Sequence, residues 1–349
     1  MSQLPENVEL LRTRVIVERD RVTSVSGSDY PHQYPGLNLE WNLEQFKKNF
    51  KLKINQVTDT DIEFDLVGVD ASIANAFRRI LIAEVPTMAI EKVYIMNNTS
   101  IIQDEVLAHR LGLIPIKADP QHFEYKSDEE GPTDLNTIVF KLKKKCERNP
   151  DASPDETDPA VKYINSAVYS GDLVWEPKGD QAERFKEAPI RPVLDDILIA
   201  KLRPGQEVDM ELHCHKGVGQ EHAKWSPVGT ASYRILPEIT ILKPITGDDA
   251  YKFQKCFPEG VVDVVEENGE KIAKVVNARK DTVSREVLRH KEFENKVRLT
   301  RVRDHFIFKV ESTGIYPPEE LFGLAVNVLM EKIKAIQPAL ERATSNEIA

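Results

Sequence analysis

Glu105 and His109 are one helical turn apart in the segment Asp104–Arg110, so they could hold a metal ion on one helix face. The segment lacks the second histidine of the H-E-x-x-H pattern, and it therefore does not support a zinc protease. Acidic residues near its start and basic residues near its end also suit the dipole of an ordinary helix. We favour this structural interpretation and keep metal binding as the alternative.

A second metal-like group consists of His213, Cys214, His215, His222 and Cys256. On a strand, His213 and His215 would share a face while Cys214 points away. Structural zinc usually has four converging ligands, and the closely spaced C-x-x-C pairs that often supply them are missing from the sequence. Ordinary surface and edge residues are therefore favoured, and we predict no metal site and no cofactor. A stand-alone metallohydrolase that uses both groups is a remote alternative.

The segment His222–Val228 contains a base, a lysine (Lys224) and a hydroxyl (Ser226), which are the groups of acyl-transfer chemistry. No nucleophile elbow surrounds Ser226, and the proline that follows it suits a turn. We expect a buried Trp225 to fix this loop, with its indole N–H bonded locally. No catalytic role is predicted here.

Phosphate and nucleic-acid chemistry find little support in the sequence. It has neither a glycine-rich phosphate loop nor a D-x-D-x-D run of carboxylates for magnesium, so we predict no catalytic residue. Basic residues gather at 141–145 and 279–303, but acidic residues interrupt or follow them and no aromatic residues are stacked between them. The net charge of −10 also opposes a nucleic-acid surface, which leaves a DNA-binding module as a disfavoured alternative.

A helix is expected over Asp70–Pro86, and it must position the residues that could contact a second protein. Asp70 can accept hydrogen bonds from the first free N–H groups, and Pro86 forbids continuation. One face is predicted to be buried and consists of Ile73, Ala76, Phe77, Ile80 and Leu81; the opposite face carries Asn75, Arg78, Arg79 and Ile82. An apolar Ile82 among arginines is expected where a helix docks against a second protein, and a solvated helix back is the alternative.

Around this helix the patterns predict an α+β protein. Strands are expected at 51–55 and 61–66 before it, and at 89–96, 137–145, 165–174, 197–202, 207–213, 233–236, 239–242 and 305–311 after it. A short helix is expected at 103–111, with Gly112 as its C′ residue, and partial helix around 285–290. Residues 147–159 are acidic and rich in proline, and we predict a mobile surface loop there.

A second long helix is expected to close the chain, with Pro317 or Pro318 in its first turn. Its apolar stripe consists of Phe322, Ala325, Val326, Leu329, Ile333 and Ile336, and further apolar residues widen it. Two interpretations stay open: a wholly buried core helix, or a helix with one flank on this protein's sheet and the other on a partner subunit.

Four segments, in order, resemble the alpha-like subunit of archaeal and eukaryotic multisubunit RNA polymerases. They are residues 75–86 (NAFRRILIAEVP), 104–116 (DEVLAHRLGLIPI), 217–228 (GVGQEHAKWSPV) and 310–322 (VESTGIYPPEELF). The likeness runs from about Leu37 to about Ala343. It implies a non-catalytic scaffold on which the two large polymerase subunits assemble.

The resemblance also implies a domain plan: an N-terminal extension at 1–36, a discontinuous dimerisation domain at 37–87 and 232–349 with two long helices on an antiparallel sheet, and a β-rich insert domain at 88–231. The implied partners are the smaller alpha-like subunit, with which the dimerisation helices form a heterodimer, the second-largest and largest subunits, and the small shared subunits. DNA would be contacted only indirectly, through the complex. The predicted subunit interface consists of Asn75, Phe77, Arg78, Arg79, Ile82, His222, Lys224, Trp225, Phe322, Val326, Leu329 and Ile333.

Cysteine usage narrows the branch of the family. Only Cys146 and Cys214 fall in the insert, so neither the zinc cluster of the polymerase II relative nor the iron–sulfur cluster of several archaeal relatives can form. The chain therefore looks like the larger alpha-like subunit shared by RNA polymerases I and III, which make rRNA, 5S rRNA and tRNA, with a polymerase II-type or archaeal subunit as the alternative. An odd number of widely spaced cysteines, no secretory signal and no membrane-length apolar run agree with the implied location in the nucleus, including the nucleolus.

Overall fold

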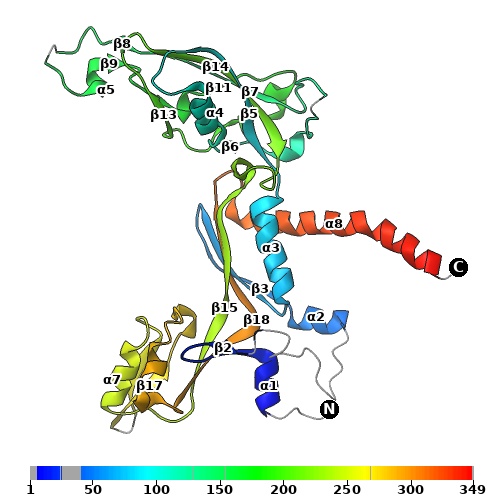
Figure 1. Cartoon of the computed structure of the whole chain (residues 1–349), viewed down its shortest axis with the longest axis vertical. Helices are drawn as coiled ribbons and strands as arrows, with labels where there is room; N and C mark the ends of the chain where they lie inside the picture. Colours follow the sequence, from blue (N-terminus) through cyan, green and yellow to red (C-terminus); the bar gives the residue numbers. More distant parts are fainter. Residues whose placement is uncertain are drawn as a thin grey trace. The chain divides into compact units, whose positions relative to one another are not determined.

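The computed structural model describes residues 6–23, 25, 41–127, 129–153, 155–267 and 269–347. Figure 1 shows its helices and strands, coloured along the sequence. The chain divides into two compact units, each interrupted in sequence. The first is Met1–Gln56, Glu63–Asn75 and Ser232–Lys309; the second is Val57–Ile62, Ala76–Ala231 and Val310–Ala349. The predicted α+β class is confirmed. The domain limits expected from the sequence divide the chain at other positions and stay a prediction.

A six-stranded sheet dominates the first unit, with strand order β2-β1-β18-β4-β3 and β15 paired to β18. The strands are β1 (Arg14–Val17), β2 (Val22–Thr23), β3 (Lys51–Val57), β4 (Asp61–Val67), β15 (Val228–Ile241) and β18 (Val297–Ser312). The expected pair of strands before the central helix is confirmed as β3 and β4, with the turn closed by Thr58 N–H donating to the Asp61 carbonyl at 2.8 Å. The two strands expected at 233–236 and 239–242 are one strand, β15.

Apolar side chains alternate along β4 and gather on one face of this sheet. Ile62, Phe64 and Leu66 are buried there, and the ring of Phe64 stacks on that of Phe308 with centroids 5.0 Å apart. Period-two alternation places apolar residues on one side of a strand, so this face forms the core of the unit.

Part of the expected N-terminal extension belongs to the sheet. Residues Glu6–Thr13 form α1, and β1 pairs antiparallel with β18, with Arg14 opposite Val302. Val15 and Val17 are buried. Residues 26–36 of the expected extension lie outside the described residues.

An additional segment lies between β15 and β18 in the chain. The sequence patterns predicted only a partly helical stretch near the end of this segment. It contains α7 (Asp248–Lys255), the hairpin of β16 (Val262–Glu267) and β17 (Glu270–Val275), and the 3₁₀ turns η4 (Ala278–Lys280), η5 (Glu286–Arg289) and η6 (Lys291–Phe293). Phe253, Val261, Val287 and Phe293 are buried in one cluster with Val17, Ile239 and Leu299 of the sheet.

The second unit is built on an antiparallel sheet of order β11-β7-β14-β5. These strands are β5 (Thr87–Asn98), β7 (Ile138–Lys145), β11 (Val174–Trp175) and β14 (Glu207–Gly217). Helix α4 (Asp104–Gly112) contributes Leu107 and Leu111 to the core, where Phe140 and Leu212 are also buried. The remaining elements are short: β6 (Ile116–Lys117), η1 (Pro120–His122), β8 (Glu147–Arg148), α5 (Pro159–Lys162), β9 (Tyr163–Ile164), β10 (Ala167–Tyr169), η2 (Ser170–Asp172), α6 (Gln181–Arg184), β12 (Arg191–Pro192), β13 (Leu198–Lys201) and η3 (Ala223–Trp225).

Three local predictions in this unit need correction. The strand expected at 165–174 is broken by η2, and Asn165 stands in the left-handed region at φ 58°. Gly112 is the last residue of α4 rather than its C′ residue, because the helix ends on Leu113 in a right-handed conformation. The acidic loop 147–159 starts inside a two-residue strand pair, β8 with β9, so its first residues are hydrogen-bonded.

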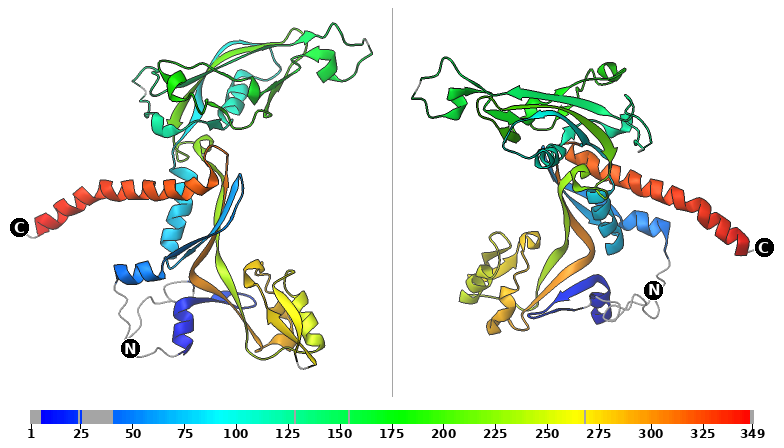
Figure 2. Two further views of the ribbon diagram at one scale, coloured as in Figure 1. Left: turned by 180° about the vertical axis from the view of Figure 1, so that it is seen from behind. Right: turned by 45° about the horizontal axis from the view of Figure 1, so that its top comes forward.

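Helix α8 (Pro318–Glu347) closes the second unit and begins at one of the two predicted prolines. Pro338 lies inside it, yet the helix continues past this residue. Figure 2 shows α8 as one long helix that leads to the C-terminus. Within the described residues, no helix combines the length and apolar character that crossing a bilayer requires.

Candidate subunit interface

The predicted central helix is α3 (Ala71–Ala83), and its start follows from Asp70. The Asp70 carboxylate accepts a hydrogen bond from Ser72 N–H at 2.8 Å, and its carbonyl accepts from Ala74 N–H at 3.2 Å. The predicted N-cap is thus confirmed.

The buried face of α3 is rotated slightly from the prediction. Phe77, Ile80 and Leu81 are buried, as predicted, and Ala76 is half-buried. Ile73 is 42% exposed, whereas Ala74, outside the predicted stripe, is buried. The expectation that Ile73 is buried was wrong, because Ala74 takes its place in the first turn of the stripe. On the opposite face Arg79 is exposed, while Asn75, Arg78 and Ile82 are half-buried.

The end of α3 is held by the loop that precedes Trp225. Gln220 N–H donates to the carbonyl of Ala83, the last helical residue, at 2.8 Å. Bonds of this kind satisfy carbonyl groups that a helix end leaves open. Two of the four family-like segments therefore meet here, one in α3 and one in the loop.

Trp225 anchors this loop from inside the second unit. It is buried, and its indole N–H donates to the His215 carbonyl at 3.1 Å, which confirms the predicted local partner. The Thr87 hydroxyl donates to the Trp225 carbonyl at 2.8 Å. A Cβ at Gly217 would lie 2.4 Å from the indole ring, so only glycine allows the strand to approach it.

Lys224 is also largely internal. Its ammonium donates to the Ile90 carbonyl at 2.9 Å, pairs with Glu91 and lies 4.5 Å from the centre of the Trp225 ring. His222 is exposed, and its Nδ1 accepts a hydrogen bond from Lys224 N–H at 3.1 Å. Trp225 and Lys224 thus have structural partners in their own chain, and any contact of this loop with another subunit stays a prediction.

The stripe of α8 divides into two parts. Leu321 and Ala325 are fully buried, and Phe322, Val326 and Leu329 are half-buried. From Met330 onward the described side chains are exposed, with Ile333 at 58% and Ile336 at 64%. The interpretation of α8 as a wholly buried core helix is therefore wrong, because its second half leaves its apolar residues in solvent.

The first half of α8 is tied to α3. The Phe322 ring packs on Phe77, and Lys332 pairs with Glu84 at 2.7 Å. A groove of about 490 Å³ runs beside it, lined by residues that include Lys216, Tyr316, Leu324, Val328 and Met330. The predicted residues Phe77 and Phe322 are thus brought together.

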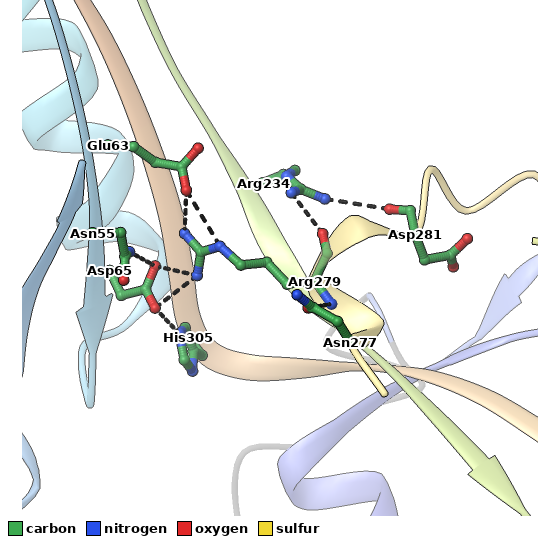
Figure 3. A network of polar contacts seen from close by, with 8 residues as sticks. All are labelled: Asn55, Glu63, Asp65, Arg234, Asn277, Arg279, Asp281 and His305. Carbon is green, nitrogen blue, oxygen red and sulfur yellow. Dashed lines mark hydrogen bonds and ion pairs between the residues drawn. The ribbon is translucent and has the colours of Figure 1, made fainter. Parts of the chain in front are cut away.

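The first unit contains a polar network centred on Arg279 and Asp65 (Figure 3). It lies on the face of the sheet opposite Phe64, because Asp65 follows Phe64 along β4. Arg279 pairs with Glu63 and with Asp65, both at 2.7 Å, and His305 and Asn55 also contact Asp65. Burial would raise the pKa of Asp65, but the hydrogen bonds from Arg279 and His305 outweigh it and hold this pKa below its ordinary value. The network fixes η4 to the sheet and explains one part of the basic stretch 279–303 as structural.

Among the described residues, the side chains that the sequence suggested for metal binding or acyl transfer are not assembled into one site. In the parts of the chain that the structure describes, no group of three His, Cys, Asp or Glu side chains is placed to hold a metal ion. Glu105 and His109 are exposed on α4, and His213 bonds to Glu211 at 2.8 Å. Desolvation lowers the pKa of His215 to about 4, and burial raises the pKa of the Cys214 thiol. The Ser226 hydroxyl donates to the Val228 carbonyl at 3.0 Å within its turn.

The basic run 141–145 is engaged with acidic side chains. Lys141 pairs with Glu176 at 2.8 Å, Lys143 with Asp209 at 2.6 Å and Lys144 with Asp172 at 2.8 Å. This pairing fits the solvated face that the sequence favoured over a nucleic-acid surface.

Sequence reasoning missed several exposed apolar residues. Leu52, Ile54 and Trp41 are 45%, 55% and 74% exposed. Alternation identifies Leu52 and Ile54 as strand residues, but it cannot say that their strand lies at the edge of the sheet, because strand order depends on contacts far apart in sequence.

Comparison with known proteins places the chain in a family. Residues 63–333 match the model of the RNA polymerase Rpb3/Rpb11 dimerisation domain. The chain is 52% identical over 336 residues to DNA-directed RNA polymerases I and III subunit RPAC1 of Homo sapiens, covering 96% of this chain and 97% of the relative. It is 52% identical over 325 residues to the subunit of the same name from Saccharomyces cerevisiae, covering 92% and 96%.

More distant relatives mark the branch. DNA-directed RNA polymerases II, IV and V subunit 3 of Arabidopsis thaliana is 31% identical over 305 residues, covering 82% of this chain and 90% of the relative. The likeness to the polymerase I and III branch noted in the sequence is thus confirmed. By the span of the match and by these identities, the chain belongs to the RNA polymerase Rpb3/Rpb11 dimerisation-domain family.

Proposed function

We propose that the chain is the non-catalytic, larger alpha-like subunit shared by RNA polymerases I and III. It forms a heterodimer with the smaller alpha-like subunit, and this pair nucleates assembly of the largest and second-largest subunits, joined by the small shared subunits. Its site of action is the nucleus, including the nucleolus where rRNA is made. The high identity to relatives named for these two polymerases supports this proposal.

The exposed second half of α8 is the observation that most directly supports the proposed heterodimer. Met330, Ile333 and Ile336 are 48%, 58% and 64% exposed on a helix whose first half is anchored by Phe322. Burying an apolar side chain of this size contributes roughly 1.5–3 kcal/mol, so a partner that covers these residues gains substantial affinity. Val326 and Leu329, half-buried in the preceding turns, continue the same contact.

We assign the other predicted interface residues to the large subunits. Arg79 is exposed on α3 beside the half-buried Arg78, Asn75 and Ile82, which suits a charged docking face for the second-largest subunit. The exposed His222 belongs to the same proposal. In this scheme the dimerisation domain comprises 37–87 and 232–349, and the insert domain 88–231.

Co-expression of the tagged full chain with the smaller alpha-like subunit tests the proposal. Ile333→Asp with Ile336→Asp should abolish co-purification, because two charges would be buried at the contact. Val174→Asp, at a residue 65% exposed on β11 of the same unit, is the matched control and should leave it intact. Arg78→Glu with Arg79→Glu should keep the pair and weaken capture of the second-largest subunit. Unchanged recovery of the partner by the α8 variant would refute the heterodimer contact.

A further inference from the structure

The apolar face of the six-stranded sheet continues onto its edge strand, where it is not covered. The Asn55 amide donates to the Asp65 carboxylate at 3.0 Å, so these two residues share a face. By alternation Leu52 and Ile54 lie on the other face, the one that buries Phe64. Yet Leu52 and Ile54 are 45% and 55% exposed, and β3 is the last strand of the sheet.

Helix α2 (Leu43–Asn49) adds further apolar side chains next to this strand in the chain. Trp41 and Leu43 are 74% and 46% exposed, and the Phe46 and Phe50 rings stack with centroids 5.4 Å apart. We call Trp41, Leu43, Phe50, Leu52 and Ile54 the α2–β3 surface. Apolar side chains exposed together in this way are typical of docking sites.

The position of α2 is fixed by the turn that leads into α3. Gly68 stands at φ +80°, and a Cβ there would lie 2.6 Å from the Asn49 carbonyl oxygen. The backbone of Gly68 donates to the Asp304 carbonyl at 2.8 Å. The end of α2 therefore packs directly on the β4–α3 turn, which makes the α2–β3 surface a built part of the first unit.

The helix beside this surface has a net positive charge, opposite in sign to that of the chain. Helix α2 carries Lys47 and Lys48 against one acidic residue, Glu44, in a chain of net charge −10, whereas Lys51 and Lys53 share the Asn55 face of β3. A partner segment with acidic residues beside an apolar stripe would complement both features.

We propose that the α2–β3 surface binds one amphipathic helix of the heterodimer partner, with the helix's apolar stripe on Leu52 and Ile54 and its acidic flank toward Lys47 and Lys48 of α2. This inference rests on the proposed function. The chain itself presents an apolar stripe of this kind in the exposed half of α8, and the family model is that of a dimerisation domain. A partner built on the same domain presents the equivalent helix, and pseudo-two-fold pairing makes the contact reciprocal. A helix fits better than an added strand, because the uncovered side chains lie on the face of the sheet and not along its edge.

The test uses the full chain and the smaller alpha-like subunit, with affinity measured by titration. Leu52→Asp with Ile54→Asp should weaken binding at least tenfold. Val276→Asp, at a residue 61% exposed in the same unit, is the control and should leave the affinity unchanged. Lys47→Glu with Lys48→Glu should also weaken binding and flatten its dependence on salt. Unchanged affinity of the Leu52/Ile54 variant would overturn the inference.

A crosslink identifies the occupant independently of affinity. The native cysteines Cys146, Cys214 and Cys256 are buried, so Ile54→Cys adds one accessible thiol. A thiol-reactive crosslinker should join it to the C-terminal helix of the partner; a crosslink to a non-helical segment or to another subunit would overturn the inference. If the wild-type chains do not associate, the proposed function fails. If the α8 variant loses binding while the Leu52/Ile54 variant retains it, only the present inference fails.

Discussion

The Phe77 ring of α3 packs against the Phe322 ring of α8, with centroids 4.9 Å apart and planes inclined at 51°. Tilted pairs of this kind add roughly 0.5–1.5 kcal/mol to the burial of each ring. Phe77→Ala should therefore lower the free energy of unfolding by about 3–5 kcal/mol, as expected for a buried phenylalanine.

Denaturant unfolding measures this effect, and a double-mutant cycle with Phe322→Ala isolates the coupling between the rings. Phe50→Ala, at a residue 36% exposed, is the control and should cost much less. Strictly additive losses in the cycle would contradict the contact.

The Asp65 network predicts a specific dependence of stability on acidity. Because the folded pKa of Asp65 is lowered, its ion pair stabilises the fold above the unfolded pKa of about 3.9 and is lost as the pH falls through the folded pKa. Asp65→Asn should be less stable than the wild type at pH 7, and the difference in Tm should shrink below about pH 4. A difference that stays constant from pH 7 to pH 3 would show that Asp65 is not the titrating group.

Lys224 should stabilise the loop that binds the C-terminal end of α3. Lys224→Met leaves the Ile90 carbonyl and Glu91 without their ammonium partner, at an expected cost of about 1–3 kcal/mol. The fluorescence of Trp225 should change as well, since the charge above its ring is lost. Lys143→Met removes an exposed pair with Asp209 and should cost much less stability, because solvent screens this pair. Equal losses in the two variants would contradict the internal role of Lys224.

Thiol reactivity should report folding. Cys146, Cys214 and Cys256 are buried, and desolvation raises the pKa of each thiol, so the nucleophilic thiolate is disfavoured in the folded chain. An aromatic disulfide reagent at pH 8 should modify none of them rapidly until denaturant is added. Fast modification of any one thiol in the native chain would place it outside the core.

Local signals in the sequence predicted the elements that they control directly. Asp70 and Pro86 marked the ends of α3 because capping and proline geometry act within a few residues. The indole partner of Trp225 was expected for a similar reason, since a buried N–H must be bonded.

The sequence could not predict which residues are buried where burial depends on contacts between distant segments. It could not show that Ile73 yields its buried place to Ala74, or that Leu52 and Ile54 lie on an edge strand, because both depend on which elements pack above them. For the same reason the sequence could not decide whether α8 is wholly buried. An apolar stripe indicates that other residues cover it, and the structure shows that this chain leaves the second half exposed.

The pairing of Arg14 with Val302 joins residues near the two ends of the chain. A growing polypeptide on the ribosome cannot form this pair until β18 has emerged, by which time the strands β5, β7 and β14 are already free to associate. The sheet of β5, β7 and β14 should therefore acquire structure during translation, while α1 and β1, like α8, take their places only near the end of synthesis.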